Sequence, residues 1–130
     1  MTFRQLYESA VKQVCEDPAE TADYEDRAGY IFGTFCTRAM YLDRRYRAAH
    51  NLGAAGEVPL VCADLDGEFP FCDVFAPCAV LYLASVLVMD ENEEMSMRLF
   101  EQYADSISTI QKDLPCQRES ITSRYDVTKG

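Results

Sequence analysis

Two carboxylates one residue apart, Asp64 and Asp66, are the residues of this chain whose type and spacing best suit chemistry. They follow a short apolar run and are followed at once by Gly67. Carboxylate oxygens bind hard cations, and alternating aspartates followed by glycine are typical of a calcium loop. The pattern is incomplete here, because the twelfth position counted from Asp64 is Phe75, where such a loop has a glutamate.

The stretch from Leu60 to Gly67 also resembles the first motif of the haloacid-dehalogenase-type phosphatases, an apolar strand followed by Asp-x-Asp-Gly. The resemblance implies that Asp64 is a nucleophile and Asp66 an acid/base, both near Mg²⁺. However, Glu68 stands where that motif has Thr or Val. The motif normally opens a parallel α/β sheet, whereas here it follows two helical segments. No later pair of aspartates follows. We therefore predict no phosphatase activity and expect these acids to form a turn.

Metal and nucleophilic chemistry have few other candidates. His50 is the only histidine, and no two cysteines have the Cys-x-x-Cys spacing of a metal site. No secretory signal is recognisable before the first helical segment, and most cysteines lie among apolar residues, where Cys acts as a small hydrophobe. We expect no catalytic residue, no cofactor and no metal. The six cysteines, which we expect to be reduced, are Cys15, Cys36, Cys62, Cys72, Cys78 and Cys116.

The chain is strongly acidic, with a net charge of −10. Such a chain repels nucleic acid and anionic membranes overall. Arg44, Arg45 and Arg47 form one basic patch near a predicted helix end, where they match the helix dipole and are candidate DNA-facing or phosphate contacts. Asp73 and Pro77 interrupt the longest apolar run before it reaches the ~18 residues of a membrane span, so no membrane contact is predicted.

Apolar residues recur at three- and four-residue steps in four segments, which predicts a mainly α fold. Thr2 with Gln5, and Asp90 with Glu93, have the spacing of capping boxes. Asp73 is the expected cap of the third helix. The result is a four-helix domain with a long second helix. The predicted helices cover residues 3–15, 22–49, 74–89 and 91–113.

Four further expectations concern single segments of the chain. Residues 60–69 predict a short β-hairpin with its turn at Asp66-Gly67, lying on the helices or paired with another chain. The third helix is apolar on almost every side, which predicts burial all round, with one side covered by a neighbouring subunit. Gly29 and Gly33 indicate a close approach of another helix or a bend. Residues 116–130 are polar, so we expect a domain at 1–115 and a flexible C-terminal tail that becomes ordered on a partner.

The order of these features resembles the small head–tail connector (adaptor) proteins of tailed bacteriophages and prophages. A short helix ends at Asp-Pro, a long helix follows, and a short β excursion leads into Phe-Pro-x-x-Asp-x-Phe-Ala-Pro. An apolar helix, an Asp-Glu-Asn-Glu turn, a Phe-x-x-Tyr helix and a polar tail complete the order. The residues that carry the resemblance are Asp73, Phe75, Ala76, Tyr82, Leu83, Ala84, Leu87, Asp90, Glu91, Asn92, Glu93, Phe100 and Tyr103.

The resemblance implies a ring-shaped homo-oligomer without catalytic activity. Such a ring docks on the portal protein, meets a tail or stopper protein, and extends a channel through which DNA passes without sequence recognition. The implied location is the virion, assembled in the cytoplasm of a bacterial host. An alternative is a small cytoplasmic helical regulatory or adaptor domain that binds one protein partner. The predicted oligomer or partner contacts are Phe69, Phe71, Phe75, Leu83, Leu87, Ile121 and Tyr125.

Overall fold

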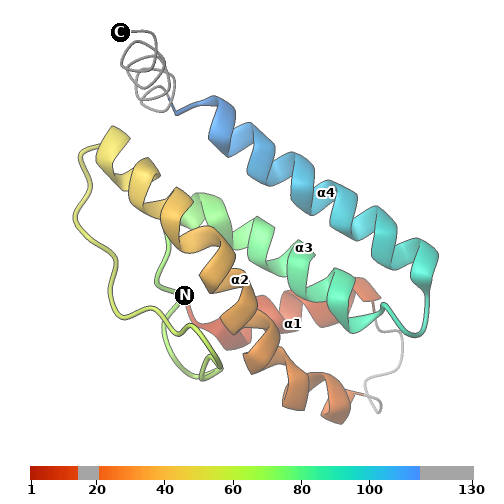
Figure 1. Ribbon diagram of the computed structural model, residues 1–130. Helices are drawn as coiled ribbons and strands as arrows, with labels where there is room; N and C mark the ends of the chain where they lie inside the picture. The colour runs from red at the N-terminus through yellow and green to blue at the C-terminus, as the bar shows by residue number, and fades with distance from the viewer. Residues whose placement is uncertain (15–20, 115–130) are drawn as a thin grey trace, which may run out of the picture.

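A computed structural model describes residues 1–14 and 21–114 of the chain. This part of the chain is mainly helical, as predicted, with a long second helix and helix ends close to the predicted ones. The predicted tail at 116–130, together with Cys15, Cys116, Ile121 and Tyr125, lies outside the described residues. The helices in chain order are α1 (Phe3–Val14), α2 (Thr21–Ala49), the short 3-10 helix η2 (Asp73–Phe75), α3 (Ala76–Leu87) and α4 (Glu93–Lys112) (Figure 1).

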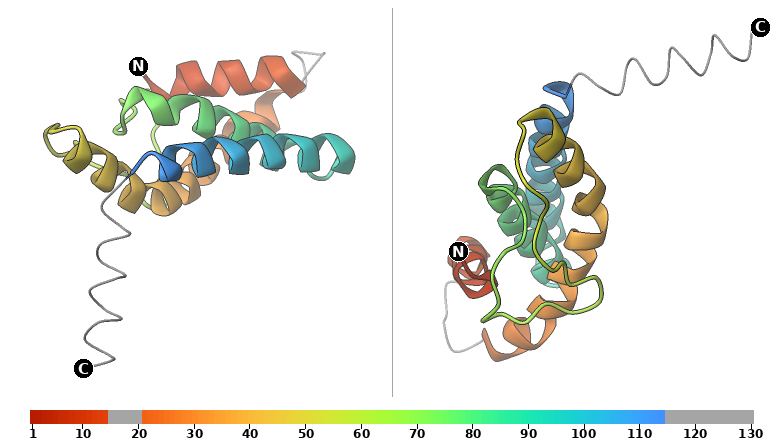
Figure 2. Two further views of the ribbon diagram at one scale, coloured as in Figure 1. Left: turned by 90° about the horizontal axis from the view of Figure 1, so that it is seen from above. Right: turned by 90° about the vertical axis from the view of Figure 1, so that its left-hand side faces the viewer.

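Helix α3 is the central element of the fold. It contacts α1, α2 and α4, and it lies between α1 and α4 (Figure 2). Nine of its 12 residues are buried. The chain's own helices thus bury most of α3, and contact of its remaining surface with a neighbouring subunit stays a prediction. Among the helices of residues 1–14 and 21–114, none combines the length and the hydropathy that a membrane span requires.

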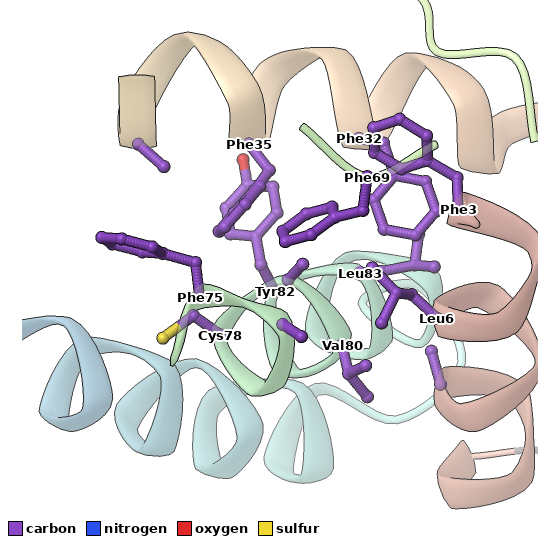
Figure 3. Packing of buried hydrophobic residues seen from close by; sticks show 14 of the residues in the cluster. Phe3, Leu6, Phe32, Phe35, Phe69, Phe75, Cys78, Val80, Tyr82 and Leu83 are labelled. Carbon is purple, nitrogen blue, oxygen red and sulfur yellow. The ribbon is translucent and has the colours of Figure 1, made fainter. Parts of the chain in front are cut away.

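The core is rich in phenylalanine. Phe32 and Phe35 on α2 are fully buried and point toward α3, and Phe3 enters from the start of α1 (Figure 3). The rings of Phe3 and Phe32 lie 5.0 Å apart, and Phe35 stands 6.1 Å from Tyr82 of α3. Such aromatic pairs stabilise a core beyond the area they bury. They join three helices around one hydrophobic cluster.

Two of the helix starts test the capping predictions. The box at Thr2 and Gln5 is confirmed: the Gln5 amide donates to Thr2 Oγ1 at 3.3 Å, and the Thr2 amide donates to Gln5 Oε1 at 2.8 Å. The cap predicted at Asp90 is wrong, because Asn92 Oδ1 accepts from the Met95 amide at 3.0 Å. Helix α4 begins two residues later than the sequence pattern indicated, and the cap moves with it.

The third predicted cap is also wrong. Asp73 lies inside the first turn of η2, and no side chain caps either η2 or α3. The 3-10 helix runs directly into α3, so the amide groups at the start of α3 follow a turn that is already helical. A carboxylate near a helix start still interacts favourably with the helix dipole.

The predicted β-hairpin over residues 60–69 is wrong. Within the described residues no strand forms, and an isolated antiparallel bridge joins Thr2 to Glu68. The segment does make a tight turn, in which the Gly67 amide donates to the Asp64 carbonyl at 2.9 Å. Its backbone pairs with other elements instead of with itself: the Leu65 carbonyl accepts from Arg4 at the start of α1, at 2.7 Å. These bonds satisfy amides that a helix start leaves without intrahelical partners.

The two glycines of α2 lie under this same segment. A Cβ on Gly29 would stand 2.6 Å from the Ala63 carbonyl oxygen, and one on Gly33 would meet the Val61 carbonyl. The Ala63 amide also donates to the Gly29 carbonyl at 2.8 Å. The close approach that the glycine spacing indicated is therefore real, but the element that approaches is an irregular segment and not a helix.

Candidate interaction surface

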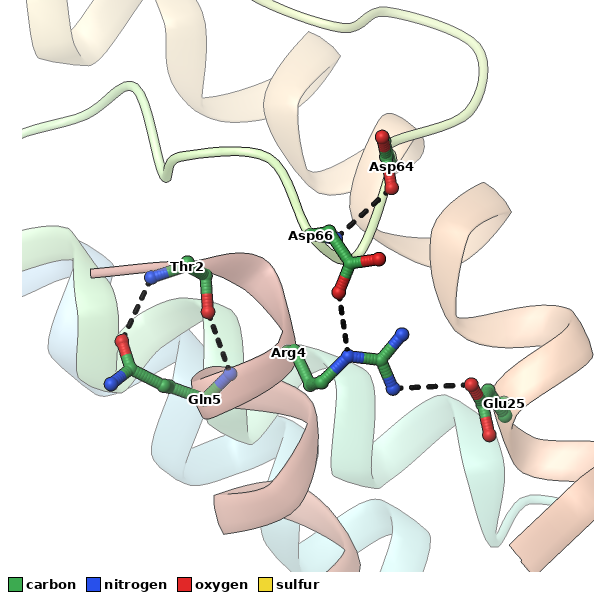
Figure 4. A network of polar contacts seen from close by, with 6 residues as sticks. All are labelled: Thr2, Arg4, Gln5, Glu25, Asp64 and Asp66. Carbon is green, nitrogen blue, oxygen red and sulfur yellow. Dashed lines mark hydrogen bonds and ion pairs between the residues drawn. The ribbon is translucent and has the colours of Figure 1, made fainter.

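Asp64 and Asp66 have structural partners. Asp64 Oδ1 accepts from the Asp66 amide at 3.0 Å, which is the bond of an aspartate-stabilised turn. Asp66 Oδ1 accepts from Arg4 Nε at 2.8 Å, and the same guanidinium reaches Glu25 Oε1 at 3.1 Å (Figure 4). The hydrogen bonds of its guanidinium to Asp66 and, to a lesser extent, to Glu25 raise the pKa of Arg4. The turn is thus tied to α1 and α2 by one arginine.

Metal binding and thiol reactivity depend on where the His, Cys, Asp and Glu side chains lie. Residues 1–14 and 21–114 contain no group of three or more His, Cys, Asp or Glu side chains placed to hold a metal ion. The cysteines of the same part, Cys36, Cys62, Cys72 and Cys78, are free thiols. Burial raises the pKa of Cys36 to about 12 and that of Cys78 to about 11, so both are protonated and unreactive at neutral pH.

The predicted basic patch divides into two parts. Arg47 turns inward: its Nε donates to Asp43 Oδ2 at 2.8 Å, and its two other nitrogens donate to the Gly53 and Pro70 carbonyls at 2.8 and 3.0 Å. Asp43 is fully buried, and its second oxygen accepts from the Cys72 amide at 3.0 Å. Arg47 therefore fastens the segment between α2 and α3 and does not face DNA or phosphate.

Arg44 is exposed on α2, whereas Arg45 is partly buried, and one of its terminal nitrogens is buried without a hydrogen-bond partner among the described residues. The nearest polar contact of Arg44 is the Met40 sulfur at 3.8 Å, and Arg45 lies over the Tyr41 ring at 5.9 Å from its centroid. Among the described residues, neither arginine has a carboxylate partner, and the same holds for Arg38, which stacks on Tyr82 instead. The arginines that do form ion pairs there are Arg4, Arg27, Arg47 and Arg98.

These arginines flank an exposed apolar strip that we call the outer face of α2. Tyr30 and Tyr41 are 61% and 66% exposed, and helical spacing places both on one side of the helix. Leu60 and Val61, which are 48% and 76% exposed, lie beside them, because the Leu60 carbonyl accepts from the Thr37 hydroxyl at 3.1 Å. Tyrosine and arginine are enriched in protein interfaces. We define the outer face as Tyr30, Tyr41, Arg44, Arg45, Leu60 and Val61.

A second exposed apolar region is hollow. It lies between the end of α3 and the first half of α4, with a volume of about 600 Å³. Met89, Met97 and Phe100 line it and are 55%, 59% and 45% exposed. Glu93 and Glu101 stand at its edge, and Arg38 reaches it from α2. We call this region the α3–α4 groove.

The residues that the sequence analysis predicted to contact other chains lie outside both of these surfaces. The structure places the aromatic and leucine residues of that set in the core of the chain, with at most 9% of each exposed. Their side chains fold this chain, so a partner has to meet other residues. The five residues concerned are Phe69, Phe71, Phe75, Leu83 and Leu87.

Some of the residues that sequence reasoning missed carry a signal that could have found them. Tyr30, Thr34, Thr37, Tyr41 and Arg44 recur at three- and four-residue steps, which marks a second stripe on α2 apart from its core stripe. Asp43 and Arg47 have the four-residue spacing of a helical ion pair. No local signal marks the α3–α4 groove, because two helices have to pack before it exists.

No protein-family model matches the chain, and searches of curated proteins and of solved structures likewise find no match.

Proposed function

We propose that this chain is a structural assembly protein of the head–tail connector kind. In this proposal copies of the chain form a ring that docks on a phage portal protein, contacts a tail or stopper protein and extends the DNA channel. The observation that carries the proposal is the outer face of α2, where two tyrosines are exposed and Arg44 and Arg45 have no carboxylate partner among residues 1–14 and 21–114. The resemblance in sequence order narrows a general assembly role to this class.

The charged groups of the chain support an assembly role over a chemical one. Asp64 and Asp66 are held in a turn and by Arg4, and Asp43 is held by Arg47. Each of these carboxylates has a structural task. The remaining candidates for function are the exposed surfaces, and exposed apolar patches mark sites of protein contact.

The overall charge supports passage of DNA rather than its capture. The chain carries 22 acidic and 12 basic residues. A protein that coats a DNA channel must not hold the phosphate backbone, and an excess of carboxylates repels it. The proposed place of action is the virion, after assembly in the bacterial cytoplasm.

Binding to the portal protein of the same genome tests the proposal. Purified portal rings are mixed with the full chain and examined by sedimentation and by negative-stain electron microscopy. We expect a ring of this chain added at one end of the portal. A variant lacking residues 116–130 is expected to bind more weakly. A genome without a portal gene, or portal rings that leave this chain unbound, would rule out the connector function.

A second candidate function is favoured by the α3–α4 groove. Methionine-lined grooves adapt to helices of many sequences, as in regulatory proteins that bind one peptide segment. In this case the chain is a small cytoplasmic regulatory or adaptor domain with one protein partner. Rings seen by electron microscopy favour the connector, whereas a compact monomer that captures one helical segment favours the regulator.

A further inference from the structure

The two exposed apolar regions of this chain differ in shape. The outer face of α2 is a ridge, since its tyrosines project from one side of a helix and Leu60 and Val61 lie along that side. The α3–α4 groove is concave, with a volume of about 600 Å³. Ridges of side chains on one helix pack into the grooves of others, and this fit sets how helices associate. The chain therefore carries both halves of a ridge-and-groove contact.

The two regions also differ in charge. Arg44 and Arg45 lie on the ridge and have no carboxylate partner among residues 1–14 and 21–114. Glu93 and Glu101 border the groove and outnumber Arg38, the one cation that lines it, and neither acid belongs to an ion pair of the described residues. A chain with ten more acids than bases could pair every surface arginine within itself. Cations left without partners on the ridge match acids left without partners beside the groove.

We infer that the outer face of α2 of one copy docks into the α3–α4 groove of a second copy. This inference rests on the proposed function, since it names the surfaces through which the copies meet. Val61 and the two tyrosines enter the groove against Met89, Met97 and Phe100. The ridge arginines then face Glu93 and Glu101 of the second copy.

The contact joins two different surfaces and is therefore heterologous. Each copy that uses its ridge on one neighbour keeps its groove free for another. Repetition of such a contact closes into a ring when the rotation between copies allows it, and otherwise extends as a filament. Two copies that bind ridge to ridge would stop at a dimer.

Complementary blocking of the two surfaces tests the inference. Val61→Asp places a charge on the ridge, and Met97→Asp places one in the groove. Both side chains are exposed, so neither change disturbs the core. By sedimentation velocity we expect the unchanged chain to form species larger than a dimer as its concentration rises, and each variant alone to remain a monomer.

The mixture of the two variants gives the decisive result. The Val61→Asp chain keeps an intact groove and the Met97→Asp chain an intact ridge, so the equimolar mixture is expected to form one-to-one dimers and nothing larger. Val74→Asp, at an exposed residue outside both surfaces, is the matched control and is expected to assemble like the unchanged chain. Circular dichroism melting confirms that each variant is folded.

Several outcomes would overturn the inference. These are a chain that stays monomeric at every concentration, variants that assemble as before, and a mixture that remains monomeric. Dimers of either variant alone would show a contact of one surface with itself. If the chain binds portal rings but the mixture fails to pair, the surfaces named here are wrong and the connector function stands.

Charge exchange tests the polar part of the contact separately. Arg44→Glu with Arg45→Glu on one chain is expected to weaken assembly by at least tenfold in the dissociation constant. Glu93→Lys with Glu101→Lys on a second chain is expected to do the same. Mixing the two is expected to give species larger than a one-to-one dimer, because the exchanged ridge and groove pair as well as the unchanged ridge and groove. These species must dissociate as salt rises, because exposed ion pairs are screened. A mixture that stops at one-to-one dimers would refute the role of these charges.

Discussion

The two sides of α2 contain similar residues and put them to opposite uses. On the side facing the segment between α2 and α3, Gly29 and Gly33 admit the backbone of residues 61–63, and Arg47 binds one buried carboxylate and two carbonyls. On the outer side, Tyr30 and Arg44 project into solvent with little to hold them. Arg44 and Arg47 are only three residues apart on the helix, yet Arg47 stabilises the fold and Arg44 remains free for a partner.

This comparison makes stability and association separable. A change on the inner side is expected to lower the free energy of unfolding, because it leaves buried polar groups without partners. A change on the outer side is expected to alter only contacts between molecules.

Thiol reactivity gives the widest contrast between the two sides. Cys36 is fully buried on the inner side of α2, whereas Cys62 is exposed beside the outer face. At pH 8 a thiol reagent is expected to modify Cys62 in the folded chain at least about 1,000-fold faster than Cys36, because Cys36 reacts only after the core opens. Peptide mass spectrometry of timed samples identifies each modified residue. Equal rates at the two cysteines would mean that the core around Cys36 is open.

The same buried thiols predict a dependence of stability on alkaline pH. Burial raises the pKa of Cys36 from 9.0 to about 12 and that of Cys78 from 9.0 to about 11. The unfolded chain therefore releases these protons first, so stability is expected to fall as the pH rises from 9 toward 11 and 12. Urea unfolding at a series of pH values measures the slope, which is expected to be smaller for the Cys36→Ala and Cys78→Ala double variant.

Arg47→Ala is expected to be the most destabilising single change. It leaves the carboxylate of Asp43 buried without its cation and frees the Gly53 and Pro70 carbonyls. Breaking a buried ion pair by removing one partner lowers the free energy of unfolding by about 3–5 kcal/mol. Urea unfolding followed by circular dichroism measures the loss. Arg44→Ala is the matched control and is expected to stay within about 0.5 kcal/mol of the unchanged chain.

Gly33→Ala tests the close approach of the irregular segment to α2. The added methyl group meets the backbone of Val61, which cannot turn aside as a side chain could. Overpacking of this kind lowers the free energy of unfolding by about 1–3 kcal/mol, and it outweighs the roughly 0.5–1 kcal/mol that alanine gains over glycine in a helix. Gly53→Ala, with no atom within 4 Å of the new carbon, is the control. A Gly33 variant as stable as this control would contradict the observed packing.

Tyr30→Ser is expected to have the smallest effect on stability. Its side chain is 61% exposed, so the free energy of unfolding is expected to change by no more than about 0.5 kcal/mol. Self-association measured by sedimentation is expected to weaken in the same variant. A large loss of stability without any change in association would place Tyr30 among the residues that hold the fold and would remove it from the outer face.

The helices were predictable because their signals are local. The apolar repeat at three- and four-residue steps locates α1, α2, α3 and α4 but not η2, and Thr2 with Gln5 forms the box that its spacing indicated. The errors fall where a long-range partner decides. Residues 60–69 contain strand-like apolar residues and a turn. Their backbone forms hydrogen bonds with amides and carbonyls of α1 and α2 instead of with a second strand.

The candidate surface was the least predictable part. The sequence does not distinguish Arg44, Arg45 and Arg47 from one another. In the folded chain Arg47 binds the buried Asp43 and turns inward. Phe69 and Leu83 are apolar enough to suit an interface, but the core takes both. Exposure depends on what the rest of the chain covers, and no window of sequence contains that information.

The helical class, the length of α2, the acidic surface and the position of one turn follow from the sequence alone, because each depends on spacing and composition along a continuous segment. Packing between distant segments selects which glycines admit a backbone, which arginine is bound inside and where a groove opens. Those outcomes depend on atoms that are distant in the chain and meet only when α3 is enclosed by α1, α2 and α4. Burial and hydrogen bonding arise from these long-range contacts. They separate residues of the same type into those that stabilise the fold and those that remain available to a partner.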